Sequence, residues 1–96
     1  MRTMKVFVLV KFGEDNLSSH FMEVVGVYST KTKAKEKMKE EKEKTRNYFY
    51  EDPNGYECDE DDCEEYGECN EVWGISCNNY PVFTELNIIE KEVDHD

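Results

Sequence analysis

The residues best suited to chemistry form one acidic run, residues 57–68, with the sequence ECDEDDCEEYGE. Eight of these twelve residues are acidic and none is basic, so the run offers a multivalent anionic surface. Such a surface attracts cations, either metal ions or a basic patch on another macromolecule. The predicted partner-binding residues all lie in this run: Glu57, Asp59, Glu60, Asp61, Asp62, Glu64, Glu65, Tyr66 and Glu68.

Calcium is the first metal to consider, because carboxylate oxygens are its usual ligands. An EF-hand loop needs Gly at its sixth position and Glu at its twelfth. In a loop that starts at Asp59 the sixth residue is Glu64, and in one that starts at Asp62 the twelfth is Trp73. Both frames fail, so the run is not predicted to hold a dedicated calcium site.

The four cysteines are the candidate ligands of a softer metal such as zinc: Cys58, Cys63, Cys69 and Cys77. Structural zinc sites use closely spaced pairs such as C-x2-C, whereas four, five and seven residues separate these cysteines. This spacing favours Cys77 as a small buried strand residue and the other three as reduced thiols of a cytoplasmic protein. No cofactor is predicted, and a domain stabilised by metal on these cysteines stays an alternative.

Catalytic chemistry has little support in this sequence. Neither His20 nor His95 forms a recognisable motif with a Ser or Cys, and the scattered glycines form no phosphate-binding loop. A run of exposed carboxylates stays ionised and lacks the contrasting environments that acid–base catalysis needs. The chain is therefore predicted not to be an enzyme, and no catalytic residue is assigned.

Charge is distributed unevenly between the two halves of the chain. Residues 51–96 carry a formal charge of −15 and residues 1–50 carry +4, which together give the net charge of −11. A protein with this charge should repel nucleic acid and anionic membranes, and should associate with basic partners in a salt-sensitive way. No apolar run approaches the roughly 20 residues of a membrane span, and the start of the chain lacks a long signal-peptide core. A cytoplasmic location is therefore predicted.

The 96 residues are expected to form a single domain, residues 1–96, of the α+β class. Val- and Phe-rich patterns predict strands at 4–12, 21–29, 71–77 and 82–93, and an uninterrupted run of helix formers after Thr30 predicts a helix over 31–48. The order is ββαββ: a small antiparallel sheet with one helix packed on a face. The acidic run falls in a long loop, about 51–70, which the core is not expected to require.

The predicted helix holds eight of the twelve basic residues of the chain. Its apolar stripe is narrow: Ala34, Met38, Thr45, and then Tyr48 or Phe49. The simplest interpretation of its charged residues is a solvated face. The alternative is that this basic face pairs with the acidic run, either folded back in the same chain or on a second copy, which leaves a homodimer open.

The stretch GVYSTKTKAKEKMKEEKEK, residues 26–44, resembles a strand–turn–helix segment of small uncharacterised bacterial and phage proteins. Those proteins often have a first strand like MKVFVLV and a last strand like NIIEKEV, and the resemblance brings no catalytic or binding residue with it. In size and charge the chain is also similar to anti-CRISPR proteins and other phage counter-defence inhibitors, many of which are small, acidic and non-enzymatic.

Charge and resemblance together predict a non-enzymatic protein that blocks a basic, nucleic-acid-binding surface of a larger protein, such as a nuclease, without binding nucleic acid or a membrane. Spaced carboxylates can mimic duplex DNA, which carries one charge per about 1.7 Å of its axis. Aromatic residues near the run suit an interface: Tyr56, Tyr66, Trp73 and Tyr80. Among them, Trp73 lies inside a predicted strand and fits the core better. The alternatives are the metal-stabilised domain and a small-ligand sponge with a pocket between sheet and helix.

Overall fold

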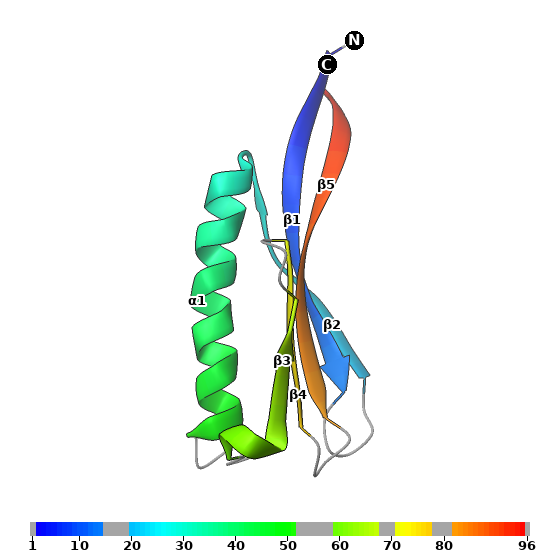
Figure 1. Cartoon of the computed structure of the whole chain (residues 1–96). Helices are drawn as coiled ribbons and strands as arrows, with labels where there is room; N and C mark the ends of the chain where they lie inside the picture. The colour runs from blue at the N-terminus through cyan, green and yellow to red at the C-terminus, as the bar shows by residue number, and fades with distance from the viewer. Residues whose placement is uncertain (1, 15–19, 52–58, 68–70, 78–81, 96) are drawn as a thin grey trace.

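A computed structural model describes residues 2–14, 20–51, 59–67, 71–77 and 82–95. Its elements follow one another along the chain as β1 (Arg2–Glu14), β2 (His20–Tyr28), α1 (Lys31–Tyr50), the short 3-10 helix η1 (Glu60–Asp62), β3 (Cys63–Tyr66), β4 (Val72–Cys77) and β5 (Phe83–His95) (Figure 1). The strands form one antiparallel sheet, and α1 lies along one of its faces. The predicted α+β class is confirmed, with two strands before the helix and three after it.

The strand order in the sheet is β2-β1-β5-β4-β3. β1 pairs antiparallel with β2, which agrees with the antiparallel sheet that the sequence predicts. The longest pairing joins β1 to β5, from Arg2 opposite His95 to Glu14 opposite Phe83, so the first and last strands lie side by side. Figure 1 shows one end of this two-stranded ribbon extending beyond the start of α1, and the molecule is 51 Å along its longest axis.

Helix α1 begins where its N-cap predicts. The Thr30 backbone is extended, and its side-chain oxygen accepts a hydrogen bond from the Lys33 N–H at 3.2 Å, which satisfies one unpaired donor of the first turn. The buried stripe consists of Ala34, Met38, Thr45 and Phe49, so Phe49 rather than Tyr48 completes it. The hydroxyl of buried Thr45 donates to the Glu41 carbonyl at 2.8 Å, which satisfies this polar group inside the helix.

The core lies between α1 and one face of the sheet. Its most buried large side chains are Leu9, Phe49, Ile75 and Leu86, which come from β1, α1, β4 and β5. Side chains alternate along a strand, so this face of β5 also takes Thr84. Trp73 is only 4% exposed, which confirms the interpretation of this residue as part of the core.

The acidic run contains a strand that the sequence did not predict. Residues 63–66 form β3, which pairs with β4 and places Cys63 opposite Cys77. Both cysteines are buried, which confirms the expectation for Cys77 and differs from the loop expected around Cys63. Two adjacent glutamates lower the β-propensity of this segment, and tertiary packing of Cys63 overrides it. This part of the acidic run therefore belongs to the sheet and contributes to its core.

Candidate functional site

The acidic run is described from Asp59 to Gly67, which covers η1 and β3. The other predicted partner-binding residues, Glu57 and Glu68, lie outside the described residues, as do Tyr56 and Tyr80. Because β3 is an edge strand, its carboxylates lie along one border of the sheet. Charged side chains on an edge strand also discourage pairing with the strands of other molecules.

Glu65 is the member of the run that the fold itself uses. Its Oε1 accepts a hydrogen bond from the indole Nε1–H of Trp73 at 3.3 Å and lies 3.2 Å from the Arg46 Nε. Its Oε2 accepts from the Tyr50 hydroxyl at 3.3 Å. One carboxylate therefore joins β3 to β4 and to the last turns of α1. No feature of the sequence separates Glu65 from its acidic neighbours. Its hydrogen bonds and ion pair, which depend on the packing of α1 and β4, distinguish it.

Two residues beside the Glu65 contacts are affected by charge: Tyr50, whose pKa is raised, and Trp73, which has a lysine over its ring. Burial, followed by the negative charge of Glu65, raises the pKa of Tyr50 to about 12. The Lys42 ammonium lies 5.5 Å from the centre of the Trp73 ring, in the geometry of a cation–π contact. The basic helix thus meets the acidic run through Arg46, within the same chain.

The remaining described carboxylates of the run stay available at the surface. Asp59, Asp61 and Glu64 are exposed and Asp62 is half-buried. Within the part of the chain that the structure describes, none of these four side chains has a hydrogen bond or ion pair. Since no cation of the described residues neutralises them, the negative field of this border acts on the surrounding solvent.

Tyr66 lies on the opposite face of β3, beside a small polar network. Its hydroxyl donates to Glu85 Oε1 at 2.9 Å, and the other oxygen of Glu85 accepts from the Asn87 amide at 2.7 Å. The ring covers Gly74 of β4, where any Cβ would collide with it. Burial and then the hydrogen bond to Glu85 raise the pKa of Tyr66 to about 12. The ring is 40% exposed and held in one orientation.

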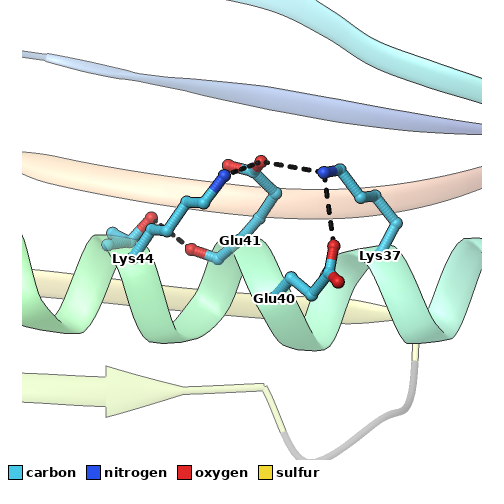
Figure 2. A network of polar contacts seen from close by, with 5 residues as sticks. Lys37, Glu40, Glu41 and Lys44 are labelled. Atoms are coloured by element: carbon cyan, nitrogen blue, oxygen red, sulfur yellow. Dashed lines mark hydrogen bonds and ion pairs between the residues drawn. The ribbon is translucent and has the colours of Figure 1, made fainter.

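Two of the eight basic residues of α1, Lys37 and Lys44, form ion pairs with glutamates of the same helix. The Lys37 Nζ lies 3.3 Å from Glu40 Oε2 and 3.9 Å from Glu41 Oε1, and Lys44 reaches Glu41 at 3.7 Å (Figure 2). These i,i+3 and i,i+4 pairs are typical of a solvated helix face, as the sequence predicted. At the start of α1, Lys31 pairs with Glu71 just before β4; a hydrogen bond and the lysine charge lower the pKa of Glu71.

The cysteines come together only in part. Cys63 and Cys77 face each other across β3 and β4, whereas Cys58 and Cys69 lie outside the described residues. Among the described residues, no group of three or more His, Cys, Asp or Glu side chains is arranged to hold a metal ion. The weak spacing signal in the sequence therefore gains no support from these residues.

A shallow groove lies between α1 and the β2 side of the sheet. It has a volume of about 290 Å³, and its lining includes Lys11, Glu23, Tyr48 and Phe49. This is near the lower limit of small-molecule pockets, and the groove is open to solvent. It lies where the sequence placed a small-ligand pocket, and its lining combines charged, hydroxyl and aromatic side chains.

Comparison of the chain with protein families, with characterised proteins and with solved structures finds no match. Among the described residues, no helix combines the length and the apolarity that a membrane span requires.

Proposed function

We propose that this protein is a non-enzymatic binding protein whose acidic border, defined here as residues 59–64, occupies a basic, nucleic-acid-binding surface of a larger protein. The observation that carries the proposal is the exposed set of carboxylates on η1 and β3 that no described cation neutralises. Dense, unpaired negative charge on a folded edge accelerates association with a basic partner and orients it.

The fold supports this proposal by giving the acidic border a firm base. Cys63 is buried in the core and Glu65 is joined to both α1 and β4, so the carboxylates on either side of them project from anchored backbone. An anchored surface loses less conformational entropy on binding than a mobile loop. Tyr66, fixed by Glu85 next to the border, supplies an exposed aromatic ring of the kind that is enriched at interfaces.

The proposal is tested by capture followed by competition. The chain is immobilised and exposed to a nuclease-treated bacterial lysate at low salt and at about 0.5 M salt, where attractions between surface charges are screened. Each basic protein retained at low salt is purified and bound to a labelled DNA duplex, and the free chain is then added. We expect the chain to displace the duplex. Capture without displacement, or no capture of a basic protein at low salt, contradicts the proposal.

A matched pair of variants assigns the effect to the acidic border. The test variant is Asp59→Asn/Asp61→Asn/Glu64→Gln, and the control is Glu23→Gln/Glu36→Gln/Glu92→Gln, whose exposed carboxylates lie on β2, α1 and β5. Each variant removes three negative charges. We expect the test variant to slow association about tenfold and the control to change it less than about twofold. Equal slowing would mean that net charge acts without this surface.

A further inference from the structure

The face of the sheet opposite α1 is strongly apolar. Six of its side chains, on three adjacent strands, remain between 41% and 75% exposed: Met4, Met22, Val24, Val27, Ile89 and Val93. Figure 1 shows α1 on the other side of the sheet, and no described element covers this face. Exposed apolar patches of such extent on soluble proteins mark interaction sites.

The register shows that these residues form one continuous surface. Val27, Val8 and Ile89 lie in a row across β2, β1 and β5, and Met4 lies opposite Val93 in the extended ribbon. Directly paired residues of antiparallel strands share a face. The apolar residues of the three strands are therefore neighbours in space.

A β-bulge keeps β2 apolar on this face. Leu9 pairs with Gly26 and Val10 pairs with Val24, so Val25 is the additional residue and packs toward the core. Without the bulge, strict alternation would turn Val24 toward α1 and expose a different set of residues. The bulge thus places Val25 toward the core and at the same time keeps Val24 and Val27 on the open face, as a third apolar strand of that surface.

We propose that this open face is the interface of a symmetric homodimer, in which the sheets of two copies pack face to face. Strands of 13, 9 and 13 residues, with a rise of about 3.3 Å per residue and a spacing of about 4.8 Å, give a flat footprint of about 550 Å². The accessible area of a corrugated side-chain surface is larger than its footprint. A specific interface buries about 800 Å² per partner, so a stable dimer would use nearly the whole of this face.

Charge on this face fits a second copy better than a basic partner. Among the described side chains of β1, β2 and β5, the ionisable ones on this face are Lys91 and three groups toward one rim, Glu14, His20 and Glu85. The register also pairs Arg2 with His95 at the opposite end of the ribbon. His20 lies 3.2 Å from Glu14, and Glu85 is bonded to Tyr66 and Asn87. A basic partner would find few carboxylates to pair with here. An identical face brings mainly apolar side chains, with its charged groups toward the ends, except Lys91, and twisted sheets stack well on one another.

The dimer leaves the surface of the proposed function accessible. Helix α1 lies on the opposite face of the sheet, and β3 lies at the edge farthest from β2. The register places Glu64 on the same side of the sheet as the open face, so the packing is centred on β1, β2 and β5, away from β3. With that placement the dimer presents two acidic borders. The dimer does not depend on the proposed function, because it involves different residues.

Sedimentation velocity on the full chain tests the dimer. At micromolar concentration, the wild-type protein is expected to sediment as a species with twice the monomer mass of 11.4 kDa. In Val27→Lys/Ile89→Lys, each dimer would bring four lysines to the packed faces in addition to the two copies of Lys91, so the dissociation constant should rise more than about 100-fold. The control Thr3→Lys/Asn47→Lys adds the same charge at exposed positions outside the face and should stay dimeric. A monomeric wild-type protein overturns the proposal.

A single variant separates this arrangement from pairing of two exposed β2 edges. Ile89 lies on β5, which is an interior strand, so Ile89→Lys disrupts face-to-face packing and leaves the β2 edge intact. We expect this variant to be monomeric with an unchanged far-ultraviolet circular dichroism spectrum. A folded Ile89→Lys protein that remains dimeric would overturn the proposed interface, as would wild-type assembly into open-ended oligomers.

Discussion

Replacement of Glu65 tests whether the acidic run contains two functionally different kinds of carboxylate. Glu65→Ala removes the acceptor of the Trp73 indole and of the Tyr50 hydroxyl, and the ion-pair partner of Arg46. Glu64→Ala removes the same charge from the adjacent residue, which is exposed and has no described partner. The two variants therefore have the same net charge, and only Glu65→Ala breaks hydrogen bonds and an ion pair of the folded chain.

The magnitude follows from the exposure of each partner. Trp73 is 4% exposed, so an indole N–H left without an acceptor costs about 1–2 kcal/mol. The Tyr50 hydrogen bond is exposed and contributes about 0.5 kcal/mol, and the Arg46 ion pair, with the arginine side chain 47% exposed, contributes about 0–1 kcal/mol. We therefore expect Glu65→Ala to lower the free energy of unfolding by about 2 kcal/mol, and Glu64→Ala to change it by less than about 0.5 kcal/mol.

Urea unfolding measures this difference directly. Trp73 is the single tryptophan of the chain and lies in the core, so its fluorescence reports the global transition, with circular dichroism as a second probe. Glu65→Gln keeps an oxygen acceptor and should lie between the two alanine variants. Equal stability of Glu65→Ala and Glu64→Ala would refute the assignment of a structural role to Glu65.

Three further results are expected from the packing. Phe49→Ala should lower the free energy of unfolding by about 3–5 kcal/mol in urea titrations, because Phe49 is 1% exposed, whereas exposed Asn47→Ala should cost less than about 0.5 kcal/mol. Gly74→Ala should push the Tyr66 ring off β4 and return the pKa of Tyr66 from about 12 toward about 10, as read by tyrosinate absorbance; an unchanged titration would contradict this contact. Unfolded tyrosines ionise near pH 10, roughly two units below the pKa of about 12 for Tyr50 and Tyr66, so stability should be complete below about pH 10 and fall as the pH rises toward about 12. The double phenylalanine variant of these two tyrosines should lose most of that decline in alkaline unfolding curves.

Local pattern was sufficient to predict most of the elements. The N-cap at Thr30 and the run of helix formers after it define α1, and its buried stripe has the predicted spacing. The Val- and Phe-rich segments become β1, β2, β4 and β5 because β-branched and aromatic side chains suit a half-buried sheet. The position of β3 was missed, because a strand of four residues with two glutamates has no local signal and forms by pairing with β4.

The sequence predicted part of one candidate site and nothing of the other. The density of carboxylates in residues 57–68 is a property of composition, and it suffices to predict an anionic surface. The sequence does not show which of those carboxylates form contacts within the folded chain. Glu65 does so through Arg46 and Trp73, which lie outside the acidic run. The apolar open face was also missed: alternation marks which residues share a face, but only the strand order and the bulge at Val25 join the exposed residues of three strands.

The sequence by itself determined the class of fold, the approximate positions of the helix and of four strands, and a strong negative charge concentrated in the second half of the chain. These are local or additive properties, set by side-chain propensity, periodicity and residue counts. The tertiary structure alone decided that β1 and β5 are neighbours, that Glu65 is joined to the helix while Glu64 faces solvent, and that one face of the sheet is left apolar and uncovered by described elements. Each of these depends on pairing between segments far apart in the chain, and such pairings are selected by the burial of the whole core rather than by any single stretch of residues.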